Sequence, residues 1–162
     1  MNFKQRTTQL LWLTVVLLSG ATTMHAQSKL NDVAVVVNPA APVNDLTLNE
    51  ARKIFRGDRQ YWSSDMPIVL LVRNPPSRER DVILRKLYSM TESEFKQYWI
   101  AKIFRAEATT GPKIVYSNSM AADLVSVIPG AIAFMSAKDV NPNLKVVKID
   151  GRLPGDPAYP LR

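Results

Sequence analysis

Short apolar runs alternate along this chain with segments whose apolar residues recur at helical spacing. Most of the runs are rich in β-branched residues, and each begins or ends at a proline, asparagine or glycine. Short continuous apolar runs of this kind are typical of strands covered on both faces. They lie at residues 33–37, 67–72, 113–116, 131–135 and 144–149. Strands that alternate with helices predict an α/β fold, in which a mostly parallel sheet is flanked by helices.

Polar residues with capping chemistry mark the expected helix starts. Thr47 and Thr91 each stand three residues before a glutamate, which is the capping-box pattern. Ser77 predicts a third helix, and the polar run from Ser117 to Ser119 predicts a fourth. Gly57 is placed to end the first of these helices.

Several other side chains carry expectations about packing. Tyr61 and Trp62 are expected in a loop after the first helix, and Tyr98 and Trp99 on the apolar face of the second. All four are interpreted as packing residues and not as an aromatic cluster that stacks against a ligand. The charged run from Arg78 to Asp81 is expected to be a solvated helix start.

The N-terminal region has a different character. Lys4 and Arg6 give it a basic start, residues 10–18 are almost entirely apolar, and small residues follow, with candidate cleavage sites after Ala21 and Ala26. This order is typical of a secretory signal peptide. The apolar run is shorter than the ~20 residues that span a bilayer. A stable membrane anchor is therefore not expected.

Cleavage after Ala26 gives the expected organisation, a signal peptide at residues 1–26 and a single domain at 27–162. The chain has no cysteine, so the domain must be held by its core without disulfides, and a bacterial lipoprotein anchor is excluded. The expected localisation is the periplasm.

Charge and composition exclude several classes of function. Loss of Lys4 and Arg6 with the signal lowers the formal net charge from +7 to +5, which favours anionic partners. The basic residues form no long run, so nucleic acid is not expected as a partner. The only histidine, His25, lies in the signal, which removes histidine-based catalysis and the usual zinc ligand sets. We therefore expect neither an enzyme nor a metal or other cofactor; an enzyme using carboxylates such as Asp65 or Glu79 is the remote alternative.

Polar residues stand where three of the expected strands end: Asn38, Arg73, and Ser117 with Asn118. In open parallel sheets, ligands bind outside the carboxyl ends of the strands. Arg73 offers a planar two-pronged donor, and Ser77 caps the helix that follows it, so a corner for an oxyanion is expected. The structural alternative is that Arg73 pairs with a surface carboxylate and Ser77 only caps its helix.

One segment has a recognisable pattern, Leu-x(7)-Ile-Phe-x-Gly-x(4)-Trp, formed by Leu46, Ile54, Phe55, Gly57 and Trp62. It resembles a segment of the periplasmic phosphate-binding proteins of ABC transporters, which have the type 2 periplasmic-binding-protein fold.

Two later segments match the same family in order. The Arg73 corner stands where the family has Arg-Ser-Asp-Gly-Ser-Gly-Thr, whose arginine, serine and backbone amides hold phosphate oxygens. Residues 130–134 look like its Gly-x-Ile-Gly-Tyr strand, with Ala133 and Phe134 in place of glycine and tyrosine. Arg78 and Glu79 replace the glycine and threonine after the serine, and a glutamate there would repel phosphate. The resemblance covers about residues 33–150 and implies a single lobe, the second of the family's two.

The resemblance implies a periplasmic solute-binding-like protein for phosphate or a related oxyanion, working with an ABC transporter permease or an envelope sensor. The alternative is an envelope protein–protein adaptor that keeps the fold without a functional ligand site. A homodimer remains open as a way to supply the missing lobe.

The signal peptide yields the first testable prediction. The protein isolated from the periplasmic fraction is expected to begin near Thr22 or Gln27, because cleavage follows Ala21 or Ala26. N-terminal sequencing or intact-mass measurement checks this. An intact Met1 terminus in that fraction would contradict it.

Overall fold

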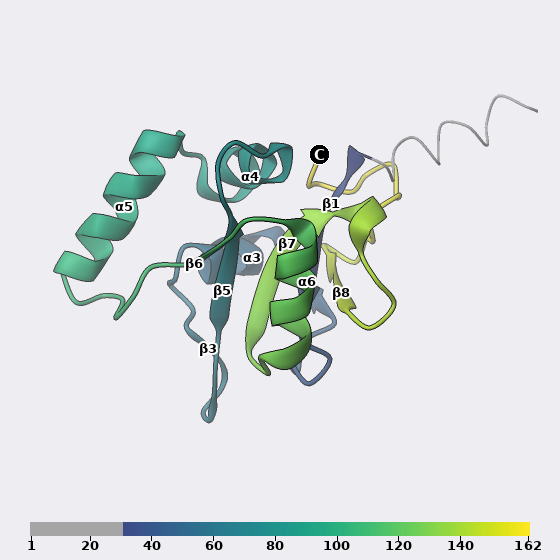
Figure 1. Cartoon of the computed structure of the whole chain (residues 1–162), viewed down its shortest axis with the longest axis horizontal. Coiled ribbons are helices and arrows are strands. Elements are labelled where there is room, and N and C mark those ends of the chain that lie inside the picture. The colour runs from purple at the N-terminus through teal and green to yellow at the C-terminus, as the bar shows by residue number, and fades with distance from the viewer. Residues whose placement is uncertain (1–30) are drawn as a thin grey trace, which may run out of the picture.

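The structure is a computed structural model that describes residues 31–162, and it contains a six-stranded sheet with helices on both faces (Figure 1). The strands follow the order β2-β8-β1-β7-β5-β6 across the sheet. Their bounds are β1 Val33–Val37, β2 Asp45–Leu46, β5 Val69–Arg73, β6 Lys113–Val115, β7 Ala131–Ser136 and β8 Lys145–Ile149. The helices are α3 Leu48–Phe55, α4 Arg78–Ile83, α5 Glu92–Phe104 and α6 Asn118–Val127. Two short turns, the π-helical η2 Leu84–Tyr88 and the 3-10 turn η3 Ala137–Asp139, complete them.

The sheet is mixed and mostly parallel. β5 runs parallel to both of its neighbours, β6 and β7, and β2 runs parallel to β8. β1 is antiparallel to β7 on one side and to β8 on the other. The predicted α/β fold is confirmed, but the direction of β1 was not predicted, because a continuous apolar run fixes burial on both faces without fixing direction.

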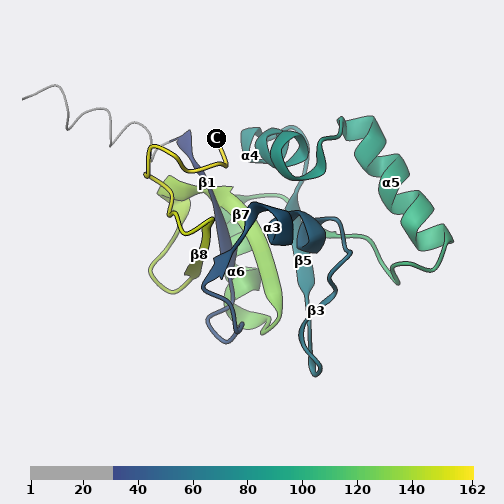
Figure 2. The ribbon, with the colours of Figure 1, turned by 180° about the vertical axis from the view of Figure 1, so that it is seen from behind.

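Two hydrophobic cores lie on opposite faces of β1. Val33, Val35 and Val37 pack into one core, which includes residues of α3 and α4, while Ala34 and Val36 pack into the other, beneath α6. Figures 1 and 2 show α6 and α3 on opposite faces of the sheet. This double covering explains why the sequence of β1 is apolar at every position.

The segment after α3 forms a small hairpin, where the sequence predicted a loop. β3 (Tyr61–Ser63) pairs with β4 (Met66–Pro67). The buried indole of Trp62 donates from Nε1 to the carbonyl oxygen of Gly130 at 3.0 Å. A Cβ at Gly130 would lie 1.9 Å from the carbonyl oxygen of Pro67, so only glycine fits there. The hairpin is therefore fixed to the start of β7.

The helices begin at the predicted caps. Thr47 and Thr91 form complete capping boxes with Glu50 and Glu94, and Ser77 and Ser117 are the N-caps of α4 and α6. Hydrogen bonds from the Thr47 backbone and hydroxyl lower the pKa of the Glu50 carboxyl, which keeps it ionised in the box. Gly57, at φ +70°, follows the C-cap of α3 as expected.

No helix within residues 31–162 is long and apolar enough to cross a membrane. The predicted signal peptide and both of its candidate cleavage sites lie outside the described residues.

The capping boxes yield the second prediction. Thr47→Ala and Thr91→Ala are each expected to lower the free energy of unfolding by about 1 kcal/mol, because each leaves a helix N-terminal donor unpaired. Urea denaturation measures the change, with Thr109→Ala, an exposed threonine outside the helices, as the control. A loss below about 0.3 kcal/mol would show that the caps contribute little to these helices.

Candidate functional site

The parallel strands bring most of the predicted ligand residues to one edge of the sheet. Arg73, the last residue of β5, pairs with Val115, the last residue of β6. Ser77 follows β5 across a link that contains a cis peptide bond between Pro75 and Pro76, while Ser117 and Asn118 follow β6. We refer to Arg73, Ser77, Ser117 and Asn118 as the β5–β6 corner.

Two nitrogen atoms of the Arg73 guanidinium lack partners within the described residues. Its Nε and Nη1 atoms are buried and have no hydrogen-bond partner among residues 31–162, although the residue as a whole is partly exposed. The ion pairs found within these residues do not include Arg73. An unpaired neutral donor costs about 1–3 kcal/mol when buried, and a charged donor costs more. A bound anion would remove this cost.

The other corner residues are partly engaged. The hydroxyl oxygens of Ser77 and Ser117 accept from the backbone N–H groups of Arg80 and Met120, which leaves each hydroxyl able to donate. Asn118 donates from Nδ2 to Oδ2 of Asp139 at 2.6 Å, and its Oδ1 is buried without a partner. The corner thus holds one cation and two hydroxyl donors, with one carboxylate close by.

Asn38 does not share this edge, and the expectation that it would is wrong. Because β1 runs antiparallel to β7, the carboxyl end of β1 lies at the opposite edge of the sheet. The Asn38 side chain is buried there and donates to the carbonyl oxygens of Val125 and Ser126 at 2.8 and 3.0 Å. Its Oδ1 accepts from the N–H of Ala40. Asn38 therefore ties the end of β1 to the end of α6.

Arg80 was expected in a solvated helix start, and this expectation is also wrong, since only 2% of the residue is exposed. Its guanidinium donates to both carboxylate oxygens of Glu92, at 2.7 and 2.9 Å. Nη1 donates to the carbonyl oxygen of Arg73 at 2.6 Å, and the guanidinium carbon lies 4.6 Å from the centre of the Phe95 ring. Arg80 thus joins the end of β5 to α4 and to the start of α5.

The sequence contained a signal that Arg80 would be buried. Ile83, Leu84 and Leu87, at three, four and seven residues beyond it, are all buried, so Arg80 lies on the apolar face of its helix. A charge on such a face predicts a buried pair and not a solvated residue.

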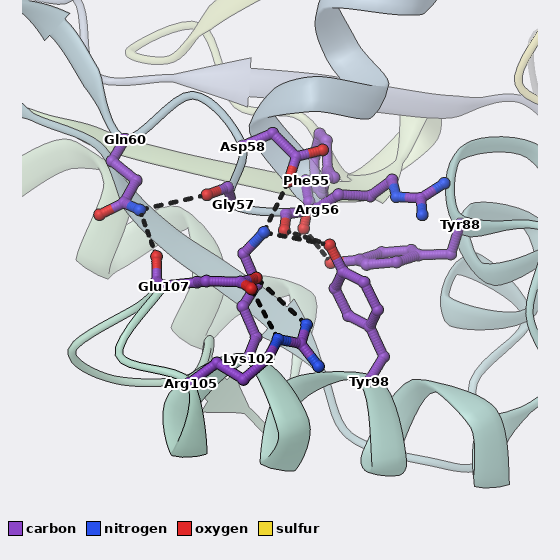
Figure 3. Close-up of polar contacts among 10 residues, drawn as sticks. All are labelled: Phe55, Arg56, Gly57, Asp58, Gln60, Tyr88, Tyr98, Lys102, Arg105 and Glu107. Carbon is purple, nitrogen blue, oxygen red and sulfur yellow. Dashed lines mark hydrogen bonds and ion pairs between the residues drawn. The ribbon is translucent and has the colours of Figure 1, made fainter.

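A second polar cluster surrounds the end of α3 (Figure 3). The hydroxyls of Tyr88 and Tyr98 donate to the carbonyl oxygens of Phe55 and Arg56, and the Lys102 ammonium donates to Asp58 at 2.6 Å. Burial by itself would lower the pKa of Lys102, but its hydrogen bonds to the Asp58 carboxylate and the Tyr98 hydroxyl raise it. These groups satisfy one another and fix α5 to α3, so we interpret the cluster as structural.

A cavity of about 260 Å³ lies near this cluster, lined by Gly57, Leu70, Trp99, Thr110 and Lys113 among others. Its lining includes the starts of β5 and β6 and excludes every residue of the β5–β6 corner. Cavity and corner therefore lie at opposite ends of these strands. No group of three histidine, cysteine or acidic residues within residues 31–162 is arranged to hold a metal ion.

Comparison with known sequences identifies the class of protein to which this α/β fold belongs. The chain belongs to the family of PBP superfamily domains, whose sequence model matches residues 21–157. The family resemblance inferred from the three sequence segments is thereby confirmed.

Solved structures share the fold over part of their length. One is a protein from Clostridium perfringens assigned as a phosphate ABC transporter substrate-binding protein, with bound phosphate (TM-score 0.61, 24% identity). Others are an ABC-type phosphate transport receptor from Vibrio cholerae (0.61, 24%) and PstS from Borrelia burgdorferi (0.60, 16%). The alignments cover 76%, 76% and 80% of this chain but only 46%, 48% and 53% of those proteins. This chain thus spans about half the length of its structural neighbours.

The buried arginine yields the third prediction. Arg80→Met, which keeps an apolar stem, is expected to lower the free energy of unfolding by about 2 kcal/mol, because it leaves Glu92 and the Arg73 carbonyl without their donor. This value lies below the about 3–5 kcal/mol for a fully buried pair, because a third of the Glu92 side chain is exposed. Thermal or urea unfolding measures the effect.

The matched control is Arg85→Met on the same helical segment. Arg85 is exposed and donates from Nη2 to the carbonyl oxygen of Arg162, so a change within about 0.5 kcal/mol is expected. Equal stability of the two variants would show that the Arg80–Glu92 pair does not hold the corner.

Proposed function

We propose that this protein is a periplasmic binding protein of half length that holds phosphate or a related oxyanion at the β5–β6 corner. The observation that carries the proposal is the Arg73 guanidinium, with buried Nε and Nη1 atoms that have no partner among residues 31–162. It stands at the carboxyl ends of parallel strands, where ligands bind in open α/β sheets. The names of the structural neighbours, which refer to phosphate, support this choice of ligand.

In the proposed complex, the Arg73 guanidinium binds two oxygens of the anion in its planar fork. The Ser77 and Ser117 hydroxyls donate to the other oxygens of the anion, and Asn118 belongs to the same corner. The function is binding without a chemical step, and it requires no cofactor.

Two features predict weak binding. Glu79 lies in the first turn of α4 and Asp139 is hydrogen-bonded to Asn118, so negative charge stands close to the corner. The corner is also one half of a clamp, and an open face leaves a ligand partly hydrated. We expect wild-type affinity no tighter than about 1 µM unless a second lobe is supplied.

The proposed role follows from the family. The liganded protein would present the anion to an ABC transporter permease or report it to an envelope sensor. An adaptor function without a ligand remains the second candidate, and the experiment on Arg73 separates the two.

The fourth prediction tests the ligand. Calorimetry with phosphate and with sulfate is expected to show binding to the wild type and a tenfold to hundredfold weaker affinity for Arg73→Ala, since a charged hydrogen bond contributes about 1.5–3 kcal/mol. Arg73→Lys is expected to restore part of the affinity, because an ammonium lacks the planar fork.

Arg85→Ala, which removes an equal charge elsewhere, is the control and is expected to leave affinity unchanged. Thermal stability of Arg73→Ala should not fall below that of the wild type, because the buried Nε and Nη1 atoms have no hydrogen bond within residues 31–162 that their loss would break. Absence of heat and of thermal shift at millimolar phosphate would refute anion binding and favour the adaptor. Unfolding of Arg73→Ala would show a structural role instead.

A further inference from the structure

The cavity beside the end of α3 shares no residue with the β5–β6 corner, and nothing described so far occupies it. Its lining includes Ile54, Arg59, Leu70, Trp99 and Thr110, and we refer to it as the Trp99 cavity. Its volume of about 260 Å³ exceeds the roughly 150 Å³ of a protein cavity that holds a benzene ring. The Trp99 cavity therefore has room for one ring with a small substituent.

The inner wall of the Trp99 cavity is apolar. Ile54 is 1% exposed and Trp99 is 7% exposed, and both pack in the core with Leu70 against them. A Cβ at Gly57 would lie 2.8 Å from Cη2 of Trp99, so the indole reaches the part of the wall that Gly57 forms. Ligand sites in proteins are lined mainly by such apolar and aromatic groups. This wall suits a ligand with an apolar body.

The charged residues that line the cavity are both cations, Arg59 and Lys113. The ion pairs found within residues 31–162 include neither of them. Hydrogen bonds from Thr47, and to a smaller extent the charge of Arg59, lower the pKa of Glu50, but Glu50 is held in the capping box of α3 and does not line the cavity. The potential at the lining therefore favours a negatively charged ligand.

Two carboxylates in the neighbouring segments are bound by other cations. Asp58 accepts from the Lys102 ammonium at 2.6 Å. Both carboxylate oxygens of Glu107 accept from the Arg105 guanidinium, at 2.6 and 3.1 Å. Neither carboxylate lines the cavity. Arg59 is thus left with positive charge that these side chains do not neutralise.

The walls of the cavity are held together by hydrogen bonds of the protein itself. Nε2 of Gln60 donates to the carbonyl oxygen of Gly57 at 3.3 Å and to that of Glu107 at 2.8 Å, as Figure 3 shows. This side chain joins the segment after α3 to the segment after α5. The cavity is therefore formed without a ligand, which lowers the cost of binding one.

We propose that the Trp99 cavity binds a small organic carboxylate with a short apolar body, about the size of benzoate. The body packs against Ile54, Leu70 and Trp99, and the carboxylate lies toward Arg59, whose planar fork suits it. Binding involves no chemical step. Because the cavity excludes every residue of the β5–β6 corner, this site is separate from the proposed oxyanion site and does not depend on it.

Calorimetry with three probes tests the class of ligand. Benzoate is expected to bind with a dissociation constant on the order of 1 mM, as a ligand of this size allows. Benzyl alcohol, which lacks the charge, is expected to bind about threefold more weakly, since a partly exposed ion pair contributes little. Acetate, which lacks the apolar body, should show no saturation in the same range. Absence of benzoate binding, or equal affinity for all three probes, would overturn the proposal.

The indole N–H signals in a nitrogen-15 correlation spectrum locate the ligand. Trp99 lines the cavity, whereas Trp62 does not and donates its indole N–H to Gly130. Benzoate is expected to shift the Trp99 signal in a saturable way and to leave the Trp62 signal nearly unchanged. Equal shifts of both signals would place the ligand elsewhere and refute the site.

Two variants test the cavity and its charge. Thr110→Phe, which fills the cavity, is expected to weaken benzoate binding at least about tenfold, since the ring then has no room. Val127→Phe is the matched control, because Val127 has a similar size, is 71% exposed and does not line the cavity. Arg59→Met is expected to weaken benzoate about threefold and leave benzyl alcohol unchanged. Circular dichroism checks that all three variants fold.

The control variants also separate this proposal from the oxyanion site. Arg73→Ala should bind benzoate like the wild type, and saturating phosphate should not displace benzoate. Loss of benzoate binding in Arg73→Ala or in Val127→Phe, or full binding in Thr110→Phe, would refute the Trp99 cavity as the site. Failure of phosphate binding alone would leave it standing.

Discussion

The buried guanidinium of Arg80 determines the geometry of the candidate site. It binds both oxygens of Glu92 and the carbonyl oxygen of Arg73, and it lies over the ring of Phe95. One charged group therefore joins the end of β5, the start of α4 and the start of α5. Because all of its partners are fixed by secondary structure, the Arg73 backbone is fixed as well. Arg73, the residue proposed to bind the anion, is therefore attached to a rigid part of the structure, as a binding residue must be.

The residues that carry the family resemblance hold the fold, and most of them do not touch the corner. Phe55 packs in the core and its carbonyl accepts from Tyr88, while Trp62 donates to the carbonyl of Gly130 just before the start of β7, away from the corner. Gly57 adopts a positive φ and allows Trp99 to approach, since a Cβ there would lie 2.8 Å from the indole. Similarity in these positions supports a shared fold. Evidence for a ligand rests on Arg73 and the hydroxyls beside it.

This chain spans about half the length of its structural neighbours. The β5–β6 corner is polar and faces solvent on one side, and it contains the Arg73 guanidinium, whose buried Nε and Nη1 atoms have no hydrogen-bond partner among residues 31–162. Ile100, Ile103 and Phe104 of α5 expose apolar side chains elsewhere on the molecule. An anion suits the first of these surfaces and not the second.

Local patterns in the sequence were sufficient for five strands of the main sheet, for the four helix caps and, to within one residue, for the ends of β5 and β6, because capping and strand burial depend on neighbouring residues. They placed Arg73 at the end of one strand and Ser117 and Asn118 at the end of another, and the parallel pairing of β5 with β6 puts these two ends at one edge of the sheet. Three features depended on tertiary structure: the reversed direction of β1, which takes Asn38 to the other edge; the partners of the buried Arg80; and the hairpin at Trp62. Each is fixed by a partner distant in sequence, β7 for Asn38, Glu92 for Arg80 and Gly130 for Trp62. A local pattern carries no information about which distant group will supply that partner.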